Sequence, residues 1–211
     1  MNRLTEHFLK HSLGVFTKAE IATAIEGTEY SRNGLIKRAI ASGDIINIRR
    51  GLYCLCPELQ KSPISVYSLA QRIYGPSYIS MESALSYHGL IPEAVYTITC
   101  ASFNNSKEFN TPLGLFSYNR IPQDIFYVGV ERIKDENNNI FFMASPIKAL
   151  AEYLYVHMLS WKDLVEPIES LRIDEERFNE INRKEIRVIM DNYHNGRVKR
   201  FLEAWVKEVT L

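Results

Sequence analysis

The sequence predicts an α+β fold, on three observations. Residues 1–60 show the spacing of three short helices followed by a two-stranded hairpin. Residues 61–211 mix helical and β-rich segments, enough for a small sheet, and end in C-terminal helices from Pro146 onward. A polar segment bracketed by prolines, Pro57–Pro63, separates the two parts. Three helices and a hairpin are typical of a winged helix-turn-helix, so we expect such a domain over 1–60 and a mixed α/β domain over 61–211.

The N-terminal helices are predicted from their caps and breaks. A first helix is expected over Asn2–His11. The run Thr17-Lys18-Ala19-Glu20 fits a capping box, in which the Thr17 hydroxyl and the Glu20 carboxylate each accept a backbone N–H of the other residue. A second helix should therefore follow it and end near Gly27. Ser31 is the expected cap of a third helix that closes at Ser42-Gly43.

The third helix has two faces and is followed by a hairpin. A helical wheel places one apolar arc toward the core: Leu35, Ile36, Ala39 and Ile40. The opposite arc should be exposed: Tyr30, Gly34, Lys37, Arg38 and Ala41, with Ser31 and Asn33 at its margins. Two β-rich runs, Ile45–Arg49 and Leu52–Leu55, flank the turn Arg50-Gly51 and predict the hairpin.

The second part alternates helices and strands. Helices are predicted over Ile64–Tyr74 and Met81–His88. The predicted strands or extended pieces are Tyr78–Ser80, Val95–Ala101, Gly114–Tyr118, Ile125–Ile133 and Ile140–Met143, with a turn at Lys134–Asn139. The C-terminal helical region should break near Pro167, Asp174 and Asn195-Gly196.

Composition limits the functional classes. Lys plus Arg and Asp plus Glu both number 25, so zero net charge argues against a general polyanion binder. The balance is uneven: residues 1–61 carry nine basic and six acidic side chains, whereas residues 62–211 carry sixteen and nineteen. This asymmetry suits a nucleic-acid-binding head joined to a protein-binding body. The sequence lacks a signal-peptide core and a membrane-length apolar run, so we expect a cytoplasmic protein without membrane association.

No catalytic or metal site is expected. The three cysteines are read as reduced thiols, and Cys54 and Cys56 lack a second ligand pair at zinc spacing. His88 lies where a helix should end and is interpreted as a structural cap. No phosphate-binding glycine loop or nucleophile elbow is present. The sequence therefore predicts neither an enzyme nor a cofactor.

The candidate DNA contacts lie on the third helix and the hairpin tip. They are Tyr30, Ser31, Arg32, Asn33, Lys37, Arg38, Arg49, Arg50 and Gly51. Lys37 and Arg38 suit phosphate or guanine, whereas Ser31 and Asn33 suit base edges near the helix start. Arginines at a hairpin tip neutralise phosphates or enter a minor groove. The helical wheel places Arg32 on the core side of the helix. Arg49 and Arg50 have a second interpretation, in which they are solvated charges on the hairpin.

Three stretches in order resemble the AbiEi-type antitoxin and transcriptional regulator family of type IV abortive-infection toxin–antitoxin systems. They are "TKAEIATA" with "YSRNGLIKRAIASGDIINIRRGLYCL", then "YISMESALSYHGLI", then "ASPIKALAEYL". The resemblance runs from about Thr17 to about Leu154. It implies an N-terminal winged helix that binds operator inverted repeats in double-stranded DNA of its own promoter, with autorepression. It also implies a C-terminal domain that counters a nucleotidyltransferase-type toxin.

Three questions remain open at the level of sequence. In a second reading, the chain is a protein-interaction antitoxin module whose DNA binding is secondary or lost. Lys148 follows Pro146 at a helix start and has either a specific carboxylate partner or ligand, or a solvated position. Arg197, Lys199 and Arg200 either add phosphate contacts or form a solvated face.

Overall fold

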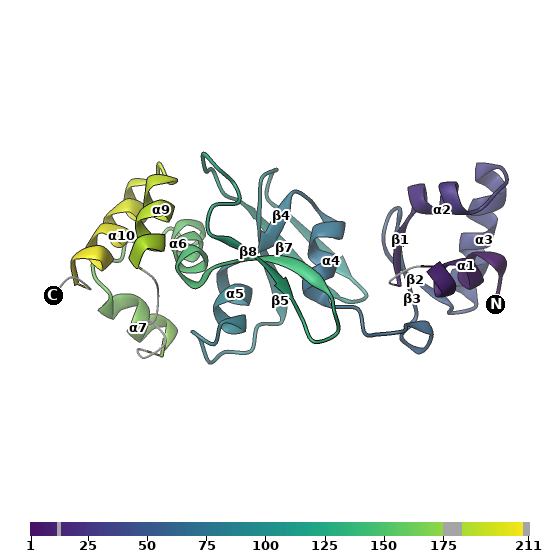
Figure 1. Cartoon of the computed structure of the whole chain (residues 1–211), viewed down its shortest axis with the longest axis horizontal. Coiled ribbons are helices and arrows are strands. Elements are labelled where there is room, and N and C mark those ends of the chain that lie inside the picture. The colour runs from purple at the N-terminus through teal and green to yellow at the C-terminus, as the bar shows by residue number, and fades with distance from the viewer. Residues whose placement is uncertain (12–13, 175–182, 209–211) are drawn as a thin grey trace.

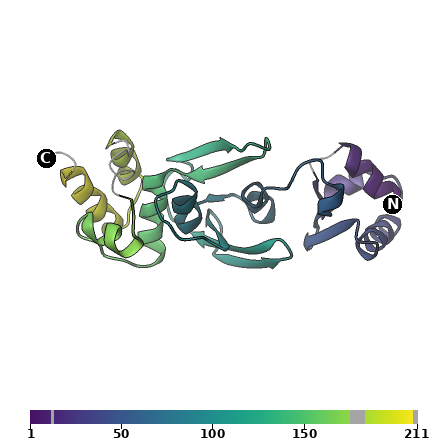
Figure 2. The same ribbon diagram turned by 90° about the horizontal axis from the view of Figure 1, so that it is seen from below.

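The chain is an α+β protein with two separate sheets, as predicted. The computed structural model describes residues 1–11, 14–174 and 183–208. Figure 1 shows an elongated molecule, with the N-terminal helices and small sheet at one end, a larger sheet in the middle and the C-terminal helices at the other end. The view after a quarter turn shows the same order along the long axis (Figure 2).

The N-terminal part has the element order α1-β1-α2-α3-β2-β3. The bounds are α1 (Arg3–His11), β1 (Val15–Thr17), α2 (Lys18–Ala24), α3 (Glu29–Ala41), β2 (Ile45–Arg49) and β3 (Leu52–Leu55). β3 is the central strand of an antiparallel sheet, with β1 on one side and β2 on the other. The three helices and the hairpin agree with the prediction, whereas the short strand β1 was not predicted.

The caps of α2 and α3 give one confirmation and one correction. The capping box is present: Thr17 Oγ1 accepts a hydrogen bond from the Glu20 amide at 3.2 Å, and the Thr17 amide donates to Glu20 Oε2 at 2.5 Å. The prediction that Ser31 caps α3 is wrong. The cap is Thr28, whose hydroxyl oxygen accepts from the Ser31 amide at 3.2 Å. Thr28 keeps the extended backbone that a cap needs, so the helix begins three residues earlier than expected.

One apolar cluster lies inside the N-terminal part. It joins α1, α2, α3 and one face of the sheet through Leu4, Phe8, Phe16, Ile21, Ile25, Leu35, Ile36, Ala39, Ile45, Tyr53 and Leu55. The prediction that Ile40 faces this core is wrong, since 39% of that residue is exposed. α3 contacts α1, α2 and β2, and these neighbours leave Ile40 outside the covered arc of the helix.

The second sheet has six strands in the order β6-β7-β5-β4-β9-β8. The bounds are β4 (Ser77–Ile79), β5 (Thr97–Ser102), β6 (Lys107–Thr111), β7 (Gly114–Arg120), β8 (Val130–Lys134) and β9 (Ile140–Ala144). The β5–β7 and β4–β9 pairs are parallel, and the other pairs are antiparallel. The edge strand β6 was not predicted.

The predicted strand over Ile125–Ile133 is wrong in its first half. Within this range only the residues of β8 form a strand, and residues 125–129 form a bend and a turn. The Ile125 amide donates to Asn192 Oδ1 at 2.7 Å, and Gly129 has a left-handed backbone with φ 68°. At Ile125, the hydrogen bond to Asn192 therefore takes the place of pairing with a neighbouring strand.

Helices surround this sheet and form the far end of the molecule. The bounds are η1 (Pro57–Leu59), α4 (Val66–Ile73), α5 (Met81–Tyr87), α6 (Pro146–Val156), α7 (Val165–Leu171), α9 (Arg183–Asp191) and α10 (Gly196–Glu208). The expected break near Pro167 is confirmed, since α6 ends at Val156 and α7 begins at Val165. Pro167 itself lies in the first turn of α7, where its missing N–H is not needed. The break at Asn195-Gly196 is confirmed. Residues that follow the expected break at Asp174, 175–182, lie outside the described part of the chain.

A second, larger cluster fills the body of the molecule. It contains buried residues of the six-stranded sheet and of α4, α5, α6, α9 and α10. Four residues of the small N-terminal sheet also belong to it: Val15, Ile48, Leu52 and Cys54. All four residues of β3 are buried because the strand has apolar contacts on both faces. This explains why "LYCL" is a continuous apolar run instead of an alternating one.

Candidate nucleic-acid interface

The exposed face of α3 carries two cations. Tyr30 is 90% exposed, and Lys37 and Arg38 are also exposed. A Cβ added at Gly34 would lie 3.6 Å from Arg38 Nη1, so the guanidinium folds back along the helix over this turn. Neither Lys37 nor Arg38 forms an ion pair with any residue that the structure describes. These two charges are therefore available to an external anion.

The first turn of α3 is more enclosed than its exposed face. Ser31, Arg32 and Asn33 are half-buried. Arg32 Nη1 donates to the carbonyl oxygen of Gly27 at 2.5 Å and to that of Ile25 at 3.4 Å. Arg32 thus satisfies backbone acceptors at the end of α2, which agrees with its core-side position on the wheel. Asn33 and Arg32 line a cleft of about 350 Å³ between α2 and α3.

The hairpin tip lies beside the start of α2. Arg49 and Arg50 are exposed, and Gly51 has a left-handed backbone with φ 81°. The Gly51 carbonyl accepts a hydrogen bond from the Lys18 amide at 2.9 Å, which fixes the tip against α2. The Arg49 guanidinium lies 5.9 Å from the centroid of the Phe109 ring on β6. Arg49 therefore reaches the body, whereas Arg50 has no ion pair within the described ranges.

Two cations near the tip were not among the predicted contacts. Lys18 is exposed and pairs with Glu29 at 2.7 Å, an interaction that lowers the pKa of the Glu29 carboxyl. Lys107 Nζ lies 5.3 Å from the Phe109 centroid and 5.8 Å from that of Tyr74. Lys18 is the first residue of α2, directly after β1, and Lys107 is the first residue of β6; neither of these two strands was predicted.

A charge pair connects the N-terminal part to the body. Arg72 Nη2 on α4 donates to Glu20 Oε2 at 3.0 Å and to Oε1 at 3.2 Å. Burial alone would raise the pKa of Glu20, but the hydrogen bonds from Thr17 and the charge of Arg72 outweigh it and lower that pKa. The carboxylate that completes the α2 capping box thus also holds α2 to α4.

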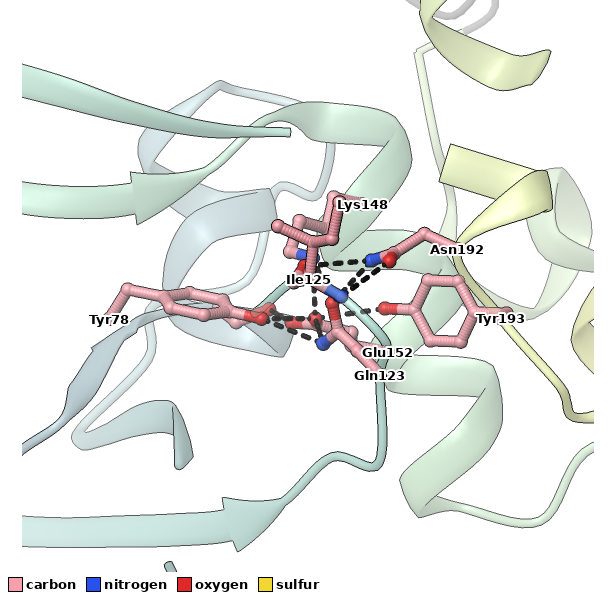
Figure 3. Close-up of polar contacts among 8 residues, drawn as sticks. Tyr78, Gln123, Ile125, Lys148, Glu152, Asn192 and Tyr193 are labelled. Carbon is pink, nitrogen blue, oxygen red and sulfur yellow. Dashed lines mark hydrogen bonds and ion pairs between the residues drawn. The ribbon is translucent and has the colours of Figure 1, made fainter. Parts of the chain in front are cut away.

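Lys148 lies in a buried polar cluster, so its predicted solvated alternative is wrong. Its side chain is fully buried, and its Nζ lies 3.4 Å from Glu152 Oε1 one helical turn along α6. Nζ also donates to Gln123 Oε1 at 2.5 Å. Figure 3 shows the lysine and the carboxylate pointing into the same site. The lysine therefore has the specific carboxylate partner that was the other expectation.

The hydrogen bonds of Glu152 are well satisfied. Its Oε1 accepts from Tyr78 at 2.5 Å, Gln123 at 2.7 Å and Tyr193 at 2.9 Å, and its Oε2 accepts from Ser80. Burial raises the pKa of both tyrosines, which keeps the phenols protonated as donors. These partners come from β4, the 121–125 loop and the segment between α9 and α10. The cluster therefore joins the C-terminal helices to the sheet.

Among the described side chains, no three His, Cys, Asp or Glu residues gather as a metal ion would require. None of the described helices combines the length and apolar character needed to cross a bilayer. No family model matches this chain, and no curated protein matches it either.

Proposed function

We propose that this chain is a DNA-binding transcriptional regulator whose N-terminal part acts as a winged helix-turn-helix. The observation that carries the proposal is the placement of three exposed cations, none in an ion pair with a described residue, on α3 and the adjoining hairpin tip: Lys37, Arg38 and Arg50. Unpaired surface cations on a helix and on a hairpin tip are suited to phosphates of duplex DNA. The element order α1-β1-α2-α3-β2-β3 supports the same assignment.

In this mode of binding, α3 enters the major groove with its exposed face toward the bases. Lys37 and Arg38 contact phosphate or guanine, and Tyr30 packs against the groove wall. Arg50 neutralises a phosphate beside the groove. Arg49 contributes from a position fixed by Phe109, and Arg32 holds the α2–α3 turn without contacting DNA.

The sequence resemblance extends the proposal to the biological role. We infer an autorepressing AbiEi-type antitoxin that binds inverted repeats in its own promoter and counters a nucleotidyltransferase-type toxin. The chain itself performs no catalysis in this role and acts in the cytoplasm. The basic head carries DNA binding, and the body over 61–211 carries the antitoxin function.

A promoter-binding experiment tests the DNA proposal. Lys37→Gln, Arg38→Gln and Arg50→Gln are combined in the full chain and compared with the wild type in a gel-shift assay on the upstream region of its gene. Loss of three phosphate contacts should weaken binding at least tenfold at moderate salt. The matched control, Lys10→Gln with Lys61→Gln and Lys134→Gln, removes three exposed charges elsewhere and should retain affinity.

Equal affinity of the triple variant and the wild type would overturn the DNA proposal. Co-expression with the neighbouring open reading frame tests the antitoxin role separately. If that frame encodes a toxin, the triple variant should still relieve toxicity, because the body is intact. If the wild type relieves toxicity and the triple variant does not, the result would support the alternative in which the N-terminal part binds the toxin directly.

A further inference from the structure

A second basic surface lies on the body of the molecule, on elements that include α6 and α10, which Figures 1 and 2 place away from α3. Three adjoining depressions of about 510, 320 and 220 Å³ form a groove along the end of β7, the end of α6 and the start of α10. Arg120, Tyr155 and Asn195 line the first two depressions, and Arg197 lines the second and third. The shared lining residues show that the three depressions are neighbours on the surface.

The groove is strongly cationic. Its basic lining residues are Arg120, Lys162, Arg197 and Arg200. None of them forms an ion pair in the part of the chain that the structure describes. Asp124 is the one carboxylate among the lining residues, and it already pairs with His194 at 2.8 Å. The net charge of the groove therefore favours an anionic ligand.

Arg197 carries an unsatisfied hydrogen-bond donor beside the groove. Its Nε is buried and has no hydrogen-bond partner among the described residues. A buried donor without a partner is costly, so an acceptor from a ligand would stabilise it. The α10 N-terminus does not provide the attraction, because Asn195 Oδ1 already accepts from the amides of Arg197 and Val198 at 3.0 and 3.2 Å.

The remaining lining residues indicate what kind of anion fits. Phe103 is 60% exposed and lines the first depression, and the half-buried Tyr155 lines the second depression together with Arg120 and Arg197. Asn119 and Ser106 add hydrogen-bonding groups, whereas the Gln123 side chain is already used in the buried cluster around Glu152. Aromatic rings beside arginines match unstacked bases attached to phosphates. Duplex DNA hides its base faces, and an acidic peptide would use the arginines but leave Phe103 in water.

We propose that this groove binds single-stranded nucleic acid, with phosphates on Arg120, Arg197 and Arg200 and a base stacked on Phe103. The site is distinct from the proposed operator-binding surface, because it lies on β7, α6 and α10 of the body, whereas α3 lies in the N-terminal part at one end of the molecule. It would let the body contact a single strand, DNA or RNA, while α3 is free or bound to duplex.

Fluorescence anisotropy on the full chain tests the proposal with a labelled 12-nucleotide single strand, as DNA and as RNA. Arg120→Gln with Arg197→Gln should lower affinity at least tenfold and reduce the salt slope by roughly 1.4, at about 0.7 per phosphate contact. Phe103→Ala should lower affinity roughly tenfold, the usual cost of losing one stacked base.

Matched controls separate this groove from general charge effects. Arg187→Gln with Lys207→Gln removes two exposed charges from α9 and α10 outside the groove and should bind like the wild type. Tyr96→Ala removes a ring that is 90% exposed elsewhere and should also have no effect. If the double variant unfolds at a lower temperature than the wild type, Arg120→Gln alone replaces it in the binding assay, because Arg120 is exposed.

Three outcomes would overturn the proposal. The first is that the wild type binds neither the DNA nor the RNA oligonucleotide. The second is that the combined Lys37→Gln, Arg38→Gln and Arg50→Gln variant loses binding while the groove variants keep it. The third is that polyglutamate competes as well as the strand and Phe103→Ala has no effect, which would assign the groove to an acidic protein segment. Retained single-strand binding in the triple variant would support two independent sites.

Discussion

The Lys148 ammonium lies 3.4 Å from the Glu152 carboxylate, and both side chains are completely buried. Burial lowers the pKa of Lys148, and the neighbouring Glu152 charge opposes that shift. The pair therefore depends on its surrounding donors, Tyr78, Tyr193 and Ser80, to compensate for lost hydration of the carboxylate.

Removing the cation of this pair should be strongly destabilising. Lys148→Met leaves a buried carboxylate without its counter-charge, so we expect the free energy of unfolding to fall by about 3 to 5 kcal/mol. Urea denaturation followed by circular dichroism measures the loss. The exposed Lys18–Glu29 pair is the control, since Lys18→Met should cost at most about 1 kcal/mol. Similar losses in the two variants would contradict the structural role of Lys148.

The assignment of the α3 cap gives a second prediction. Thr28→Ala removes the hydroxyl that accepts the Ser31 amide, so it should lower stability by about 1 kcal/mol. Ser31→Ala should change stability by less than about 0.5 kcal/mol, because the Ser31 hydroxyl is not the cap. Chemical denaturation of both variants decides between them. A larger loss for Ser31→Ala would restore the cap expected from the sequence.

Glu20 should make the molecule sensitive to acid. Its pKa in the folded protein lies below the ordinary 4.5, so the unfolded chain binds the proton more tightly. The stabilisation is therefore fully present above pH 4.5 and is lost as the pH falls through the folded-state pKa. In Glu20→Gln, the urea midpoint should fall less steeply with acidification below pH 4.5. Parallel curves for the variant and the wild type would exclude this contribution.

The three thiols should differ in reactivity. Cys54 and Cys100 are buried, and burial raises the pKa of the Cys54 thiol to about 11. Cys56 is half-exposed just after β3, although its pKa is also raised. We expect iodoacetamide to label Cys56 first in the native protein, as read by mass spectrometry of peptides. Faster labelling of Cys54 would show that β3 opens from the body.

Local signals gave correct results where a few adjacent residues determine the structure. The Thr17–Glu20 capping box and the Ile45–Leu55 hairpin depend on neighbours in sequence, and both are present. Strand β1 has three residues, too few to show alternation, and the edge strand β6, "KEFNT", is mostly polar. Both form because a longer strand, β3 or β7, offers a pairing partner.

The functional residues also divide into those that the local sequence predicts and those whose environment depends on distant parts of the chain. The exposure of Lys37 and Arg38 followed from helical period alone. The burial of Lys148 did not, because its enclosure needs Gln123 from a distant loop and Tyr193 from the C-terminal region. The cationic groove was also hidden in the sequence, since Arg120 and Arg197 are far apart along the chain and line the same depression only in the folded structure.

The most direct test of the central claim is the salt dependence of promoter binding. Affinity of the full chain for its upstream duplex is measured at salt concentrations from 50 to 200 mM, for the wild type and for Lys37→Gln with Arg38→Gln and Arg50→Gln. Each lost phosphate contact should reduce the slope of log affinity against log salt by about 0.9, so we expect the slope to fall by roughly 2.7. An unchanged slope would contradict the claim that these three side chains contact DNA phosphates.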